Sequence, residues 1–255
     1  MMSKLTLKES NALIAKKHTS FMTRYNEETN NSIMNTKIYR NDTIIIANKS
    51  QEINSEIIIE DLDTVSAAYK EAFKNKDSNI AILNFASYKN PGGGFIDGAM
   101  AQEESLCHVS NLYNILASFD CSYYSWNRKN LNKSLYFNRA LYSPNVHFEK
   151  SEIVKYFNVV TCAAPNLGPG LKYDNVTLEE NSKVLHSRIK FVLDIMSEND
   201  NDTIILGAFG CGIFKQDPSE VASIFKELIP EYSFKKVIFA IPGGKNLEAF
   251  RKVFE

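Results

Sequence analysis

The chain has 255 residues, of which 44% are hydrophobic and 23% charged, and this composition is typical of one large globular domain with or without a short extension. Its formal net charge of −1 excludes the broad basic field with which proteins hold nucleic acid, so no direct binding in a nucleic-acid groove is expected. No apolar run approaches the roughly 20 residues that span a bilayer, and the N-terminal segment lacks the apolar core of a signal peptide. We therefore expect a cytoplasmic protein that does not enter a membrane.

Apolar patterning predicts strands that alternate with helices. Residues 1–36 are expected to be helical and polar. In chain order, the further expected elements are strands over 44–47 and 57–59, a helix over 62–76, a strand over 80–86, a helix over 102–119, strands over 141–144 and 156–164, a helix over 175–197, a strand over 203–206, a helix that begins at 217–220, a strand over 237–241 and a helix over 247–254. Asp217 and Pro218 suit the N-cap and the first position of the helix that they open.

This alternation predicts a layered α/β fold with a mainly parallel sheet. In such sheets, ligands bind beyond the carboxyl ends of the strands. Two glycine-rich loops, one after the strand over 80–86 and one after the strand over 203–206, are expected at that edge. The sequence therefore predicts a ligand site between these two loops.

The cysteines and histidines give no pattern of their own. The cysteines are scattered without a CxxC pair, which predicts free, mostly buried thiols in a reducing compartment; they are Cys107, Cys121, Cys162 and Cys211. No cysteine and histidine cluster has the spacing of a zinc site. We therefore expect no metal and no cofactor.

The first glycine loop reads PGGGFIDGAMAQEE over residues 91–104. Three consecutive glycines leave a bare backbone that can approach a ligand closely and adopt positive φ. Glu103 and Glu104 follow at the start of a predicted helix, where the helix dipole also gives carboxylates a structural role. Their coupling to the glycines favours a functional role, since a carboxylate pair can supply acid–base chemistry.

The second glycine loop reads GAFGCG over residues 207–212, between a strand and a helix. Successive backbone N–H groups in such a turn form a nest that binds anions, although a simple tight turn is the alternative. No GK[ST] sequence follows, so this is not a Walker loop, and no acidic residue lies where a dinucleotide-binding fold would place one. The pattern favours a site for phosphate.

Together, GGG, seven residues and QEE resemble the signature of poly(ADP-ribose) glycohydrolases. The second loop with the following Ile-Phe resembles the diphosphate loop of macrodomains, the fold that binds ADP-ribose, and residues 161–166 and 237–241 are also similar to the family. The resemblance is to the compact bacterial type and covers roughly residues 36–254. It implies a macrodomain-like three-layer α/β/α fold with a mixed, mainly parallel sheet. It also implies an N-terminal helical accessory segment over 1–35 and a catalytic domain over 36–255.

The resemblance implies a role for each matching residue. Glu104 would be the catalytic acid and base, Glu103 would bind ribose hydroxyls, and Gln102 would organise the pair. The further ligand-binding positions that it implies are Gly92, Gly93, Gly94, Gly210, Cys211, Gly212, Ile213 and Phe214. Many macrodomains have an asparagine where Ser87 stands, so either Asn90 replaces that ribose contact or the contact is lost. Asn84 is a second candidate.

The implied activity is hydrolysis of the ribose–ribose O-glycosidic bonds of poly(ADP-ribose), which passes through an oxocarbenium-like state and releases ADP-ribose. The expected partners of this monomer are poly(ADP-ribose) or ADP-ribosylated macromolecules. Two alternatives stay open. One is a hydrolase of ADP-ribose attached to a protein side chain or a nucleic-acid base, with segment 120–150 deciding access. The other is a macrodomain that binds ADP-ribose without cleaving it, although such a protein would not need the two glutamates.

Two aromatic features have competing interpretations. His108 lies one turn after Glu104 on the predicted helix and is within reach of it, but a packing role is favoured. Trp126, Tyr123 and Tyr124 could stack an adenine, but core or interface packing is favoured for them as well.

Overall fold

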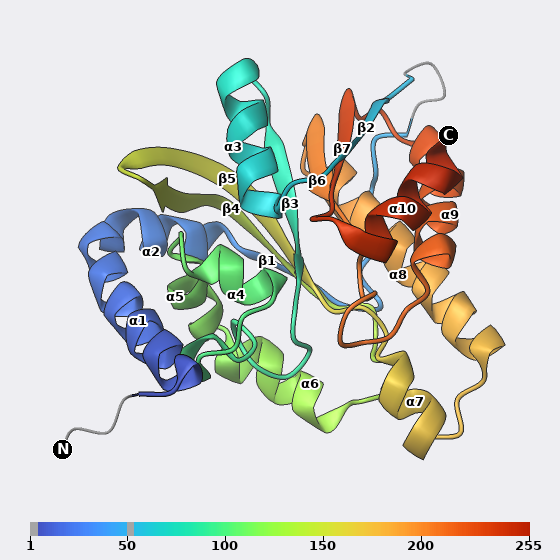
Figure 1. Cartoon of the computed structure of the whole chain (residues 1–255), viewed down its shortest axis with the longest axis horizontal. Coiled ribbons are helices and arrows are strands. Elements are labelled where there is room, and N and C mark those ends of the chain that lie inside the picture. Colours follow the sequence, from blue (N-terminus) through green and yellow to red (C-terminus); the bar gives the residue numbers. More distant parts are fainter. Residues whose placement is uncertain (1–4, 50–53) are drawn as a thin grey trace.

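The computed structural model describes residues 5–49 and 54–255, and within them it forms a seven-stranded mixed sheet between helical layers (Figure 1). Across the sheet, the strands are β1 (Lys37–Tyr39), β4 (Ala140–Lys150), β5 (Ile153–Cys162), β3 (Ile80–Phe85), β6 (Thr203–Leu206), β7 (Lys236–Ala240) and β2 (Glu56–Glu60). Neighbouring strands are parallel except where β4 pairs with β1 and β5. This confirms the predicted α/β class with a mixed, mainly parallel sheet.

The helices cover both faces of the sheet. One side carries α1 (Leu7–Met22), α2 (Asn26–Asn35), α3 (Thr64–Lys74), α4 (Gln102–Cys107) and α5 (Leu112–Ala117); the other carries α8 (Leu178–Glu198), α9 (Pro218–Leu228) and α10 (Gly244–Phe254) (Figure 1). The shorter elements are the 3-10 helices over Thr23–Tyr25, Phe95–Asp97 and Ile229–Glu231, the π-helix over Asp120–Tyr124, α6 (Ser125–Lys129) and α7 (Leu167–Tyr173). The helices expected over 62–76, 175–197 and 247–254 are confirmed with small shifts of their ends.

Alternation along the central strands divides the core into two layers. On β3, Ala81 and Leu83 pack into the layer beneath α8 and α9, while Ile80 and Ile82 pack into the layer beneath α3 and α4. Successive side chains of a strand point to opposite faces, so a strand buried on both sides is apolar throughout. This explains why the continuous run over 80–86 forms a central strand.

Helix α1 lies on the first glycine loop. Thr6 and Glu9 form a capping box that begins α1, since the Thr6 hydroxyl accepts from the Glu9 N–H and the Glu9 carboxylate accepts from the Thr6 N–H. A Cβ atom on Gly98, whose φ is +80°, would lie 2.0 Å from the Lys8 carbonyl oxygen. The α1 backbone therefore rests directly on the segment between the glycines and the glutamates. The division into an accessory segment over 1–35 and a catalytic domain over 36–255 stays a prediction.

The prediction of a strand over 44–47 is wrong. Ile44 and Ile46 are 86% and 76% exposed, while Ile45 and Ala47 pack against the core. The Ile46 N–H donates to the Glu198 carboxylate and not to a strand. The segment thus alternates like a strand without a partner strand, which the sequence pattern does not reveal.

The prediction of a single helix over 102–119 is also wrong, because this segment forms two helices, α4 and α5. Between them, Ser110 forms a β-bridge with Phe148 of β4, and the Asn111 N–H donates to the His147 carbonyl oxygen. The Asn111 side chain donates to Thr29 and accepts from the His147 N–H. These contacts with β4 and α2 replace helical hydrogen bonds, so a long-range pairing interrupts the local pattern.

The strand expected to end at Pro144 continues to Lys150. The pairing of β4 with β5 shifts register between Ser143 and Val146, so Pro144 lies in a bulge. A bulge tolerates a residue that has no N–H to donate to the ladder. The proline therefore bends this strand without ending it.

No helix among residues 5–49 and 54–255 is long and apolar enough to cross a membrane.

The cysteines are free as predicted: Cys107 and Cys162 are buried, Cys211 is half-buried and Cys121 is exposed.

The expected start of α9 is confirmed. The Asp217 carboxylate accepts hydrogen bonds from the N–H groups of Ser219 and Glu220 at 2.7 and 3.2 Å, and Pro218 is the first helical residue. This cap satisfies two donors that the helix itself leaves unpaired.

We predict that Asp217→Ala lowers the free energy of unfolding by about 1 kcal/mol, because α9 loses its N-cap. Chemical denaturation measures this value. Asp77→Ala, in the exposed turn after α3, is the matched control and should leave stability within about 0.5 kcal/mol of the wild type. Equal stability of the two variants would contradict the capping role.

Candidate active site

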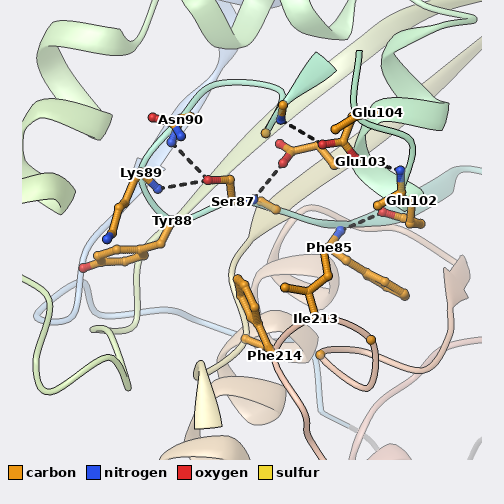
Figure 2. Close-up of a pocket in the computed structure, with 18 of the residues that line it drawn as sticks. Phe85, Ser87, Tyr88, Lys89, Asn90, Gln102, Glu103, Glu104, Ile213 and Phe214 are labelled. Atoms are coloured by element: carbon orange, nitrogen blue, oxygen red, sulfur yellow. Dashed lines mark hydrogen bonds between the residues drawn. The ribbon is translucent and has the colours of Figure 1, made fainter. Parts of the chain in front are cut away.

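A cavity of about 560 Å³ lies between the two glycine loops, beyond the carboxyl ends of β3 and β6 (Figure 2). One wall comes from residues 85–104 and the other from residues 208–214, with Tyr136 and Ala164 between them. A single cavity thus lies where the sequence predicts a ligand site. Its walls place two glutamates opposite the second loop.

Gly93 is the point at which the first loop and the glutamates meet. Its φ is +62°, and a Cβ atom there would lie 2.5 Å from Glu104 Oε1 and 2.9 Å from Glu103 Oε2. Real Cβ atoms do not approach other atoms so closely, so only glycine fits. Both carboxyl groups therefore pack against the same bare stretch of backbone.

Glu104 is fixed by backbone donors. Its Oε1 accepts from the Gly94 N–H at 2.8 Å, and its Oε2 accepts from the Ala101 N–H at 3.0 Å. The residue lies in the first turn of α4, is 6% exposed and lines the cavity. Each oxygen has one of its two lone pairs engaged, so the carboxyl group is oriented while it can still bind a ligand.

Glu103 contacts the end of β3. Its Oε2 accepts from the Ser87 N–H at 2.7 Å, and its Oε1 accepts from the Asn84 amide at 3.2 Å. Burial raises the pKa of Glu103 to about 8; the charge of Glu104 adds to this rise, and the bonds from Ser87 and Asn84 oppose it. A buried carboxyl group resists ionisation because the charged form loses its hydration.

Gln102 connects α4 to the sheet. Its Oε1 accepts from the Phe85 N–H at 2.9 Å (Figure 2). Its Nε2 donates to the Leu83 carbonyl oxygen at 2.9 Å and to the Thr64 hydroxyl at 3.3 Å. The bonds to Phe85 and Leu83 both involve backbone groups of β3 next to the cavity. Gln102 therefore fixes the start of α4, and with it the two glutamates, relative to β3.

The second loop offers backbone to the cavity. Gly210 has a φ of +79°, and a Cβ atom there would lie 2.7 Å from the Ala164 Cβ, so the turn needs glycine. No atom lies within 4 Å of the position that a Gly212 Cβ would take, so there is free space beside this residue, although its carbonyl oxygen accepts from the Lys215 N–H. Ile213 is 77% exposed, and Phe214 packs edge-on against Tyr136 with ring centroids 6.1 Å apart.

Most of the predicted site residues line this cavity: Asn90, Gly93, Gly94, Gln102, Glu103, Glu104, Gly210, Gly212, Ile213 and Phe214. Gly92, Asn84 and Cys211 lie outside the lining. Gly92 packs against Tyr113, Asn84 is fully buried behind Glu103, and Cys211 packs against the core, where burial raises its pKa to about 12. The structure thus gives Asn84 a supporting position behind the carboxyl group.

Ser87 and Asn90 shape the mouth of the cavity. The Ser87 hydroxyl accepts from the N–H groups of Lys89 and Asn90 at 3.3 and 3.1 Å, which folds this part of the loop into a turn. Asn90 is exposed at the rim, away from the two glutamates (Figure 2). The Ser87 hydroxyl therefore binds backbone N–H groups of its own loop. Of the two candidate asparagines, Asn90 lines the cavity and Asn84 does not.

Sequence reasoning missed an aromatic platform made of Tyr88 and Tyr136. Their rings stack with centroids 4.1 Å apart and an interplanar angle of 8°, and both residues line the cavity. Tyr136 lies in an irregular segment with a φ of +62°. No local pattern connects it with Tyr88, 48 positions earlier, so only the fold reveals the pair.

The other aromatic candidates pack elsewhere. The His108 ring lies edge-on to Phe95 at 4.7 Å, outside the cavity lining. Tyr123 and Tyr124 are buried, as the favoured interpretation expects, and Trp126 lies outside this cavity. No group of three or more histidine, cysteine or acidic side chains that could hold a metal ion occurs within residues 5–49 and 54–255.

Comparison with known proteins agrees with this geometry. Residues 6–151 match the family model of the microbial-type PARG catalytic domain. The structure of poly(ADP-ribose) glycohydrolase (PARG) from Thermomonospora curvata is 28% identical and superposes with a TM-score of 0.87, covering 96% of this chain and 99% of that one. PARG from Deinococcus radiodurans in complex with ADP-ribose is 30% identical, with a TM-score of 0.79 and coverage of 89% and 97%. A comparison with curated proteins found no match.

The family model spans more than half of the chain and includes both glutamates and the first glycine loop. The two similar structures cover 96% and 89% of this chain. This chain therefore belongs to the family of microbial-type poly(ADP-ribose) glycohydrolase catalytic domains.

Proposed function

We propose that this chain hydrolyses the ribose–ribose bonds of poly(ADP-ribose) and releases ADP-ribose, with Glu104 as the group that transfers the proton. The observation that carries the proposal is the packing of Glu103 and Glu104 against Gly93 at the wall of the cavity. The Deinococcus enzyme, which is similar over nearly all of its length, is described in complex with ADP-ribose. A ligand of that kind suits a cavity with one acidic wall and one wall of open backbone.

The reaction needs a proton on the leaving ribose oxygen while an oxocarbenium-like state develops on the other ribose. Glu104 lines the cavity with an orientation set by two backbone bonds, so it can hold a proton towards that oxygen. After the bond breaks, the resulting carboxylate takes a proton from the attacking water. One oriented carboxyl group thus serves both steps.

Glu103 is proposed to hold a proton of its own beside Glu104. Because its pKa is raised to about 8, this carboxyl group is largely protonated at neutral pH and can donate a hydrogen bond to a ribose hydroxyl. The two carboxyl groups are coupled, since the charge of Glu104 contributes to the rise at Glu103. Because the two groups are coupled, the proposed reaction requires that the transferable proton be on Glu104 when it meets the leaving oxygen.

The second loop is proposed to bind the diphosphate through backbone N–H groups other than those of Phe209 and Cys211, which donate within the loop, with the free space at Gly212 as the point of closest approach. Phe214 and the stacked rings of Tyr88 and Tyr136 offer apolar surface for the riboses. One chain supplies all of these groups, and the monomeric state stays a prediction. The cytoplasmic location stays a prediction.

The two alternative functions share this cavity. A module that only binds ADP-ribose has no use for two buried carboxyl groups whose burial is costly, so their presence favours hydrolysis. A hydrolase of ADP-ribose linked directly to protein or nucleic acid would use the same wall. Release of ADP-ribose from purified polymer, compared with release from singly ADP-ribosylated protein, separates these two substrates.

Glu104→Gln should lower kcat on purified poly(ADP-ribose) by about a thousandfold, because the amide cannot transfer the proton. Glu103→Gln is the matched variant and should lower kcat by only about tenfold, because an amide resembles the protonated carboxyl group. ADP-ribose release measures both values, and titration with ADP-ribose checks that each variant still binds. The reverse ranking of the two losses would assign the proton transfer to Glu103.

The activity should fall as the pH rises through about 8. The pKa of Glu103 lies above its ordinary value of 4.5, so the protonated form persists up to about 8 and is lost above it. The pH profile of kcat/KM measures this limb. Glu103→Gln should abolish the limb, and a limb that persists in this variant would show that another group titrates there.

Stability provides an independent check of the same titration. Between 4.5 and about 8 the folded state binds more protons at Glu103 than the unfolded state does, so this contribution to stability is complete below 4.5 and is lost as the pH rises through about 8. The Tm of Glu103→Gln relative to the wild type should therefore rise between pH 5 and pH 9. A constant difference would contradict the raised pKa.

Gly93→Ala should lower kcat/KM by about a hundredfold, because the added methyl group displaces both carboxyl groups. Gly168→Ala in α7 is the matched control: its Cβ atom would meet only the Lys215 Cγ at 3.5 Å, and its activity should equal that of the wild type. Wild-type activity in Gly93→Ala would show that the carboxyl groups need no close contact with this backbone.

A further inference from the structure

A second cavity of about 430 Å³ opens where β1 ends and β4 begins. Tyr39 pairs with Ala140 in the sheet, so the residues next to them, Arg40 and Arg139, reach the same edge. The lining comes from the loop after β1, from Trp126 of α6 and from the segment that leads into β4. Neither glycine loop contributes to it, so this is a separate site.

Arg139 is a buried cation with donors to spare. It is 4% exposed, and its Nε donates to the Asn127 amide oxygen at 2.8 Å. Its guanidinium carbon lies 4.3 Å from the centroid of the Trp126 ring. Among the described residues, no carboxylate lies within ion-pair distance of Arg139 and neither of its amino groups has a hydrogen-bond partner. The guanidinium carbon also lies 5.1 Å from the centroid of the Tyr123 ring. A buried charge without a counter-ion is costly, so an anion at the two amino groups would stabilise the side chain.

The surroundings of Arg139 add positive charge and ring surface. Arg40 is exposed at the rim, and Asp42 is the carboxylate in the lining. Burial lowers the pKa of Arg139, the charge of Arg40 lowers this pKa further, and the charge of Asp42 raises it. Trp126 is 39% exposed, and Phe137 meets it edge-on with centroids 5.7 Å apart. The cavity therefore offers two guanidinium groups beside an exposed indole.

We propose that this second cavity binds a further ADP-ribosyl unit of the polymer, with its phosphates on Arg139 and Arg40 and its adenine against Trp126. A guanidinium presents paired donors that match a phosphate, and an exposed aromatic ring stacks a nucleobase. This inference rests on the proposed function, because it takes its ligand from the polymer whose terminal unit occupies the first cavity.

The two cavities share one wall. The Asn127 amide donates to the Tyr88 carbonyl oxygen at 2.9 Å, and the same side chain accepts from Arg139. Tyr88 lines the first cavity and Arg139 lines the second. Asn127 thus lies between them, so a polymer that leaves the first cavity along this side passes the second.

The test measures binding in the catalytically impaired Glu104→Gln background, with size-fractionated poly(ADP-ribose) as one probe and ADP-ribose as the other. Arg40→Ala and Arg139→Gln should each weaken polymer binding by about tenfold and should retain the affinity for ADP-ribose. Arg251→Ala, which removes an exposed arginine from α10 near the opposite edge of the sheet, is the matched control and should change neither value.

Polymer affinity equal to that of the parent in Arg40→Ala would overturn the proposal, and because Arg40 is exposed, this variant decides the question even if Arg139→Gln fails to fold. Equal competition by single-stranded DNA of matched charge would also overturn it, since the cavity would then hold any nucleotide chain. Failure of the proposed function is a separate result: the enzyme with an intact Glu104 would release no ADP-ribose from polymer, whatever the binding data.

Discussion

The site depends on the burial of two neighbouring carboxyl groups against the bare backbone of Gly93. Burial of a charge costs several kcal/mol unless partners compensate for it. Here the partners are the backbone N–H groups of Ser87, Gly94 and Ala101 and the amide of Asn84. Among the described residues, no lysine, arginine or histidine forms an ion pair with either glutamate. A cation would favour ionisation of both groups, so neutral donors leave the pair able to keep a proton at neutral pH.

The sheet holds this arrangement in place. Asn84 on β3 pairs in register with Thr161 on β5, and its amide donates to both the Thr161 hydroxyl and Glu103. Gln102 occupies two backbone groups of β3 and so fixes the start of α4. On the outer side, α1 rests on Gly98. A shift of β3 or of α1 would therefore move the glutamates. The position of residues 91–104 thus depends on elements from several parts of the chain.

The spatial arrangements that could be predicted from the sequence are those that local chemistry determines. The glycines and glutamates lie within residues 91–104, and the cap of α9 lies within four residues, so their spacing contains the information. Other features depend on partners that are remote in the chain. Asn111 breaks a helical pattern because His147 offers backbone hydrogen bonds, and Tyr136 enters the site only because the fold stacks it on Tyr88. The supporting position of Asn84 behind Glu103 likewise follows from the register of α4 against β3.

Charge links the two cavities. Poly(ADP-ribose) is a polyanion, yet the chain has a net charge of −1, and within the described part of the chain Lys89 is the one cation in a first cavity that is also lined by Asp97, Glu103 and Glu104. Long-range attraction cannot gather such a substrate, and the acidic wall opposes it at short range. Backbone N–H groups can hold one diphosphate, but they add no net charge. Arg139 and Arg40 supply that charge on the far side of Asn127, where it attracts the polymer without pairing with Glu103 or Glu104. The position of these two arginines on the far side of Asn127 thus leaves Glu103 and Glu104 without an arginine as an ion-pair partner.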